Sequence, residues 1–159
     1  MSKPAYDVSL NDLIDAVKSN SSNIVQNLLD NGGDHLLNEL DATKNTAIFY
    51  AVDFPEMLSF LLERGADVNG PQNSILCPAV RSYHKSYIRN QQTTLNSNSN
   101  CPPKFENDET SLGILLNQND VNLEMSCNAE NGFTALFDAI ELQNLEAVRL
   151  LLNKSANAK

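Results

Sequence analysis

Three cysteines and two histidines are the side chains of this 159-residue chain best suited to act as nucleophiles, bases or metal ligands. Cys77 and His84 are the thiol and base closest in sequence. In a helix running through both, two turns would separate them by about 10 Å, which is too far for direct proton transfer. We therefore expect no catalytic residue. The alternative, part of a cysteine-dependent enzyme, rests on Cys77 or Cys101 as nucleophile.

Metal and phosphate-binding patterns are also missing from the sequence. The cysteines and histidines show no CxxC or HxxxH spacing, so we expect no metal. The adjacent pair Gly32 and Gly33 is typical of a helix end, not of a phosphate-binding loop, and we expect no cofactor. An odd number of widely spaced cysteines favours free thiols in a reducing compartment, which predicts a cytoplasmic location.

The charge balance narrows the class of partner. Lys and Arg total 11 against 20 Asp and Glu, a net charge of -9, which opposes binding to nucleic acid or to an anionic membrane. The sequence contains no apolar run long enough to span a bilayer and no secretory signal at its start. We expect a monomer whose partner is another protein, with no nucleic acid and no membrane.

A two-helix pattern is repeated along the chain. Residues 132–157 place apolar side chains at helical spacing before and after a polar break, which predicts two short helices, each apolar on one face. The same layout recurs over residues 46–69 and 11–34. Because each unit buries little surface alone, the units must stack on one another. The pattern predicts an all-α helical repeat fold.

Two strings carry a resemblance to a known family. LLERGADVN at 61–69 resembles the end of an ankyrin repeat, and GFTALFDAI at 132–140 resembles its beginning. The resemblance implies a single-domain solenoid over 1–159, with β-hairpin-like turns between units at about 10–40, 41–70, 71–125 and 126–159. Thr46 and Thr134 stand where an N-cap hydroxyl is expected, and Gly65 where a left-handed residue ends a helix.

The family resemblance also implies a function, that of a protein-protein interaction module. Its partners dock on the concave side, built from hairpin tips and the exposed face of the first helices. Carried over by position, that surface comprises Ala42, Thr43, Asn45, Asp53, Phe54, Arg81, Ser82, Glu130, Asn131, Phe133, Glu141 and Leu142. We expect aromatic anchors there, with acidic groups that steer a basic partner.

An insertion at about 83–107 fills a place where the family has a tight turn. Its second half is too polar to offset its ordering entropy, so we expect a long, partly mobile loop. Its first half continues at helical spacing. It holds Tyr83, Lys85, Tyr87 and Arg89. Two interpretations stay open: tyrosines that pack on the neighbouring unit, or a second protein-binding surface.

Two further expectations come from the family and from the chain's end. Asn69, in the DVN turn, matches the position that asparaginyl hydroxylases modify in this family. The apolar face of the helix around Leu150–Leu152 resembles that of an internal unit, which predicts a fragment or the N-terminal part of a longer protein. The remaining alternative is a host-directed effector of an intracellular bacterium, acting in the host cytosol.

Overall fold

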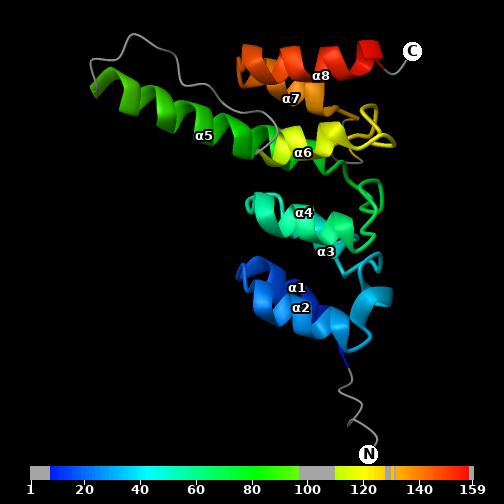
Figure 1. Ribbon diagram of the computed structural model, residues 1–159. Helices are drawn as coiled ribbons and strands as arrows, with labels where there is room; N and C mark the ends of the chain where they lie inside the picture. The colour runs from blue at the N-terminus through cyan, green and yellow to red at the C-terminus, as the bar shows by residue number, and fades with distance from the viewer. Residues whose placement is uncertain (1–7, 97–109, 128–129, 131, 158–159) are drawn as a thin grey trace, which may run out of the picture. The chain divides into compact units, whose positions relative to one another are not determined.

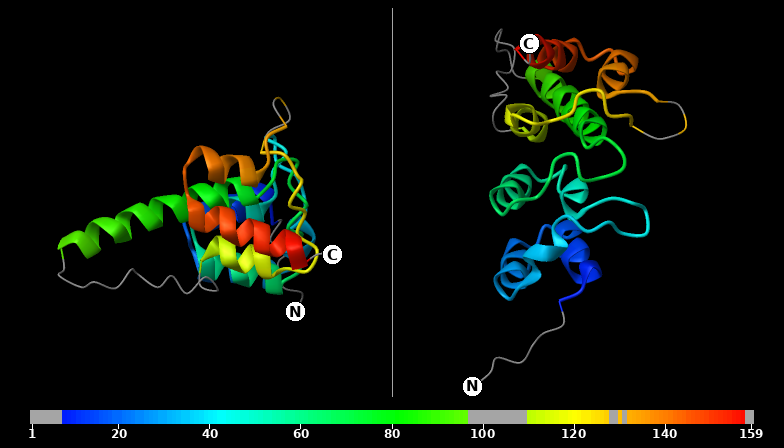
Figure 2. Two further views of the ribbon diagram at one scale, coloured as in Figure 1. Left: turned by 90° about the horizontal axis from the view of Figure 1, so that it is seen from above. Right: turned by 90° about the vertical axis from the view of Figure 1, so that its right-hand side faces the viewer.

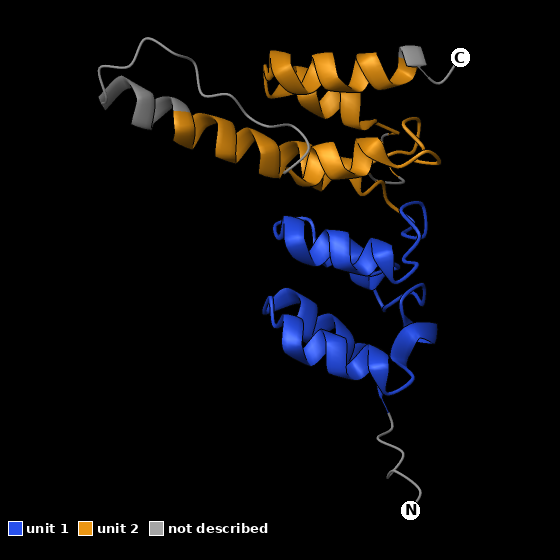
Figure 3. Cartoon of the chain, in the orientation of Figure 1, with its two compact units in different colours: residues 1–72 blue, residues 73–159 orange. Residues whose placement is uncertain are grey.

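The computed structural model describes residues 8–96, 110–127, 130 and 132–157. The chain divides into two compact units, residues 1–72 and residues 73–159 (Figure 3). Each unit contains two helical repeats, and each repeat is a pair of helices. The expectation of one domain over the whole chain stays a prediction.

The described part of unit 1, residues 8–72, contains four α-helices and one short 3-10 helix. The first repeat pairs α1 (Leu10–Lys18) with α2 (Ser22–Asp30), followed by η1 (Gly33–Leu36). The second repeat pairs α3 (Ala47–Tyr50) with α4 (Pro55–Glu63). Within this unit α1 packs on both α2 and α3 (Figure 1).

Local sequence signals fix the ends of these helices. The Ser9 side chain accepts a hydrogen bond from the Asp12 N–H at the start of α1, and Pro55 opens α4, where its missing N–H costs nothing. Gly65 follows α4 with φ 95, the left-handed geometry expected for it. Thr46 occupies the N-cap of α3, but its hydroxyl makes no capping hydrogen bond, so that expectation is wrong.

The core of unit 1 lies between its two repeats. Apolar residues three and four apart on each helix point inward, because that spacing places them on one face. The largest of these side chains are fully buried: Leu13, Val17, Leu29, Leu37, Ile48, Met57, Leu58 and Leu61.

Unit 2 repeats the arrangement with one unusually long helix. Its first repeat pairs α5 (Leu76–Asn96) with α6 (Ser111–Asn117), and its second pairs α7 (Ala135–Glu141) with α8 (Leu145–Asn157). An isolated antiparallel bridge joins Ser126 to Thr134 across the hairpin before α7. Thr134 is at the N-cap of α7 but, like Thr46, makes no side-chain capping bond.

The helix α5 corrects the expected insertion. The first half of the insertion continues α5 as its helical spacing predicts, but the helix runs on to residue 96, so the loop expected for the polar second half is wrong for residues 91–96. The C-terminal part of α5 extends past the ends of α6 and α8 (Figures 1 and 2). Within α5 the one proline is Pro78, which lies in the first turn, where a missing N–H is tolerated. Residues 97–107 of the insertion lie outside the described residues.

Candidate functional site

The hairpin that precedes α3 in unit 1 is organised around one carboxylate, that of Asp41. Its Oδ1 accepts hydrogen bonds from the backbone N–H of Thr43 at 2.8 Å, from the Thr43 hydroxyl at 2.7 Å and from the N–H of Asn45 at 3.0 Å. The Tyr50 hydroxyl, on α3, donates to Oδ2. The hairpin tip is therefore held in one conformation and tied to the first helix of its repeat.

These hydrogen bonds also fix the charge of Asp41. Partial desolvation raises its pKa, but the hydrogen bonds from Tyr50, Thr43 and Asn45 outweigh that effect and lower it to about 2. Lys18, from the neighbouring helix α1, lies with Nζ 4.2 Å from the centre of the Tyr50 ring. The hairpin and the first helices of both repeats thus share one polar surface.

Unit 1 exposes most of the residues expected on this surface. Ala42, Thr43 and Asp53 are exposed, and Phe54 is half-buried. Asn45 is 7% exposed, and its amide nitrogen donates to the Thr43 hydroxyl at 3.1 Å. Asn45 therefore supports the hairpin from within and is not a contact residue.

The corresponding hairpin of unit 2 presents an aromatic pair. Phe133 is 40% exposed, and its ring stacks on that of Phe137 with 3.9 Å between the centroids. Glu130 and Glu141 are exposed and Leu142 is half-buried. Asn131, the remaining residue expected here, lies outside the described residues.

The basic and aromatic group on α5 is only partly a surface. Tyr83 is 3% exposed, so this side chain packs in the core, and its burial raises its pKa to about 12. Lys85 and Arg89 are exposed, whereas Ser82 and Tyr87 are half-buried. For Tyr83 the packing interpretation holds, and its assignment as a binding residue is wrong.

The exposed Arg81 on α5 contacts the neighbouring repeat. One of its guanidinium nitrogens lies 2.7 Å from Asp138 Oδ2 on α7, with side-chain exposures of 56% and 15%. This ion pair links the two repeats of unit 2. Arg81 therefore has a structural role, although more than half of its side chain is exposed.

Two of the three cysteines form a disulfide, which corrects the expectation of free thiols. Cys77 on α5 and Cys127 in the hairpin before α7 are bonded, although 50 residues separate them. Cys77 therefore has no free thiol to act as a nucleophile, and the support for a reducing compartment is lost. Cys101 lies outside the described residues.

Asp138 lies close to this disulfide. Its carboxylate and the two sulfur atoms are all within 4.8 Å of one another. A metal would need thiolate ligands, but here both sulfurs are bonded to each other and the carboxylate is paired with Arg81. The donor set does not fit a metal ion in this state.

Asn69 is half-buried in the loop after α4. Its backbone N–H donates to Asp67 Oδ1 at 2.8 Å, which fixes the turn. Hydroxylation of Asn69 stays a prediction.

Sequence reasoning missed Asp41 in the first hairpin, and it missed Tyr50 on α3 and Lys18 on α1, which lie against it in turn. A signal for the first was present, because an Asp two residues before a Thr is typical of a turn in which the carboxylate accepts backbone N–H bonds. The contact between Lys18 and Tyr50 joins separate repeats, and no local spacing indicates it.

Two protein-family models match the segments that contain these repeats. A family model for ankyrin repeats in three copies matches residues 11–90, and a model for a single ankyrin repeat matches residues 131–159. No curated protein matches the chain. In the part of the chain that the structure describes, no helix is long and apolar enough to cross a membrane.

Proposed function

Since this chain belongs to the ankyrin repeat family, we propose that it is a non-catalytic module that binds another protein. The expected all-α ankyrin-repeat fold is confirmed, and binding of protein partners is the general role of these repeats. The cytoplasmic location expected from the sequence stays a prediction, and the disulfide between Cys77 and Cys127 removes the free-thiol argument for it.

The hairpin of unit 1 is the binding surface that we favour. The single observation that carries this choice is the set of hydrogen bonds on Asp41, which fixes a tip whose Ala42 and Thr43 side chains are exposed. A loop that is already ordered loses little conformational entropy when it binds, so more of the contact energy becomes affinity. The exposed Asp53 and half-buried Phe54 extend the surface along the end of α3.

The charge of unit 1 indicates the chemistry of the partner. Residues 1–72 contain 4 Lys and Arg against 11 Asp and Glu. Asp41, with its pKa of about 2, stays ionised at every physiological pH. An acidic surface of this kind favours a basic segment of the partner, mainly by accelerating association and rejecting acidic competitors.

A pull-down from a lysate of the source cells, followed by mass spectrometry, tests this function. The wild-type chain is compared with two variants. The hairpin variant carries both Ala42→Arg and Asp53→Arg, and the control variant carries Glu63→Arg, which changes an exposed acid on the second helix of the same repeat. We expect a protein with a basic segment that the wild type and Glu63→Arg retain, and that the hairpin variant loses. Equal retention by all three chains would contradict the proposed surface.

The exposed cations of α5 form the second candidate surface. Lys85 and Arg89 lie four residues apart, so they share one side of the helix. The variant Lys85→Glu with Arg89→Glu belongs in the same pull-down. Loss of the partner from this variant alone would show that the partner binds α5 and not the hairpin.

A further inference from the structure

The last repeat of unit 2 exposes an apolar helix face, which we call the tail face. It consists of Ile140, Leu145, Val148 and Leu152, and its first, second and fourth members are 55%, 82% and 49% exposed. A hollow lined by Ala139, Ile140, Gln143, Leu145 and Val148 lies in this face. Isolated exposed apolar residues need no explanation, but a contiguous group on one face does.

The repeat register identifies what such a face normally contacts. Ile140 occupies the position of Val17 in the first repeat and Val80 in the third, and both valines are fully buried at 0% exposure. Leu152 occupies the position of Leu29 and Leu116, which are 1% and 7% exposed. Each of those repeats is followed by another in the same unit, and α1 packs on α3, α5 on α7 and α6 on α8. The tail face is therefore half of a repeat-repeat joint.

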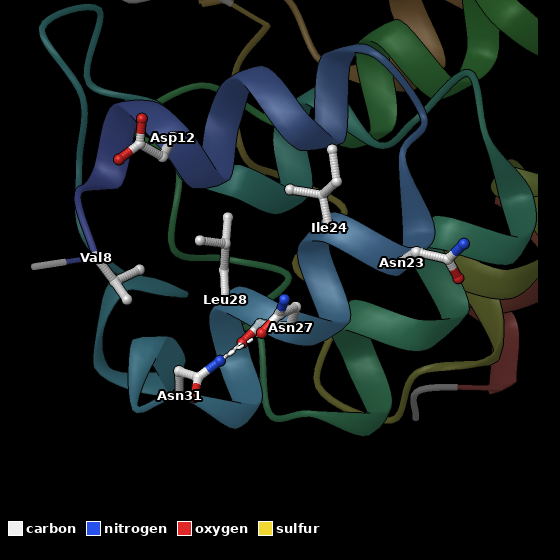
Figure 4. A pocket seen from close by; sticks show the side chains of 7 residues that line it. All are labelled: Val8, Asp12, Asn23, Ile24, Asn27, Leu28 and Asn31. Carbon is white, nitrogen blue, oxygen red and sulfur yellow. Dashed lines mark hydrogen bonds between the residues drawn. The ribbon is translucent and has the colours of Figure 1, made fainter. Parts of the chain in front are cut away.

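The first repeat of unit 1 exposes the other half of such a joint, which we call the head face. Val8, Ile24 and Leu28 line a pocket there, rimmed by Asp12, Asn23, Asn27 and Asn31 (Figure 4). Ile24 is 54% exposed, whereas Met57 and Ala147 at the same position of later repeats are 1% and 0% exposed. Each of those two residues belongs to a repeat that follows another repeat within its own unit.

The edges of the two faces are also matched. Arg64 and Lys154 occupy equivalent positions at the end of the second helix of their repeats. Arg64 forms an ion pair with Asp30 of the preceding repeat at 2.7 Å. Lys154 donates a hydrogen bond to the backbone carbonyl of Gln118, also in the preceding repeat, at 2.8 Å. On the head face that position is Asn31. The register equivalent of Asp30 on the tail face is Asn153. At this edge a joint between the two faces would bring together two neutral amides, and the charge of Asp12 on the head face keeps its hydrogen bond from the Ser9 hydroxyl.

We propose that a second copy of this chain docks head to tail, with the tail face of one copy stacked on the head face of the other. Because the two faces differ, every complex keeps one free head and one free tail, so the assembly grows with concentration. This surface is separate from the hairpin surface. The proposal differs from the monomer expected from the sequence.

Sedimentation velocity of the full chain from low to high micromolar concentration tests the docking. The tail-blocked variant is Ile140→Glu with Leu145→Glu, and the head-blocked variant is Ile24→Glu. Each variant should stay monomeric alone, because a joint needs one intact tail face and one intact head face, and every copy of the variant lacks the same one. Their equimolar mixture should form a dimer that does not grow further, since one intact head and one intact tail remain. Leu40→Glu and Ile88→Glu, at other residues with 51% and 42% exposure, are the matched controls and should associate like the wild type.

Three results would overturn the proposal: a wild-type chain that stays monomeric at every concentration, a blocked variant that still dimerises alone, or a mixture that remains monomeric. Circular dichroism checks that the variants are folded. If a Glu variant loses helical signal, the Ser variants of the same residues provide the same test. Asn31→Arg with Asn153→Asp adds an ion pair to the joint and should tighten association about threefold, the effect of one exposed pair.

Discussion

Tyr50 on α3 donates a hydrogen bond to Asp41, nine residues earlier in the preceding hairpin, and so fastens the hairpin tip to the first helix of its repeat. The same carboxylate organises the tip itself through Thr43 and Asn45. Charge-assisted hydrogen bonds such as these are stronger than neutral ones, because one partner is ionised. One carboxylate therefore determines both the shape and the charge of the proposed binding surface.

Removing the Tyr50 hydroxyl should loosen this hairpin. Tyr50→Phe keeps the ring under Lys18 but loses the hydrogen bond to Asp41, so we expect the free energy of unfolding to fall by about 1 kcal/mol. Urea denaturation followed by circular dichroism measures the change. A double-mutant cycle with Asp41→Asn should show coupling between the two residues, and additive effects would show that the bond contributes nothing.

The stability of unit 1 should depend on pH through Asp41. Its pKa is lowered from 3.8 to about 2 in the folded chain, so its contribution is complete above about pH 5 and is lost as the pH falls from about 4 to 2. Allowing for solvent screening of this partly exposed group, we expect a loss of about 1 kcal/mol over this window. Denaturation of the wild type and Asp41→Asn at both ends of the window measures it. The variant should lack this part of the pH dependence, and identical profiles would refute the assignment.

The disulfide should stabilise unit 2. It closes a loop of 50 residues between α5 and the hairpin before α7, and loops of this size typically gain roughly 2–4 kcal/mol from a disulfide. We expect Cys77→Ser with Cys127→Ser, or a reducing agent, to lower the melting temperature of this unit. Alkylation without reduction should label one cysteine per chain, and alkylation after reduction should label three. Three labels before reduction would show that the bond does not form.

Substitution of Gly65 should destabilise the folded chain because of the backbone conformation at this position, not because of crowding by its surroundings. Its φ of 95 is left-handed, while a Cβ placed there would meet nothing within 4 Å. Gly65→Ala should therefore lower the free energy of unfolding by about 1 kcal/mol, and Gly65→Asn by less, since Asn tolerates this region better. Equal effects of the two substitutions would contradict a purely conformational cost.

The repeat fold was predictable from the sequence because its signals are local. The apolar spacing over residues 11–34 and 46–69 predicted helices with one apolar face, and Val17, Leu29 and Ile48 within them are buried. The left-handed residue expected at Gly65 has a φ of 95. The disulfide was not predictable, because no local pattern pairs cysteines 50 residues apart and their free state was inferred from number alone. The length of α5 was underestimated, since a polar composition does not prevent a helix whose first turns are anchored by packing.

The candidate site was less predictable than the fold. Position alone identified the exposed Ala42, Thr43 and Asp53, because a family pattern specifies which positions lie on the hairpin. It could not show that Tyr83 is buried, since periodicity does not distinguish a solvent face from one covered by another helix.

Site-specific photo-crosslinking in the source cells tests the central claim most directly. A photoreactive amino acid is placed at Ala42, on the ordered hairpin tip, and in a second chain at Glu63, which is also exposed, on α4. We predict that the chain labelled at residue 42 crosslinks to a protein with a basic segment, and that the chain labelled at residue 63 does not. No adduct from residue 42, or the same adduct from both positions, would contradict binding through the hairpin surface.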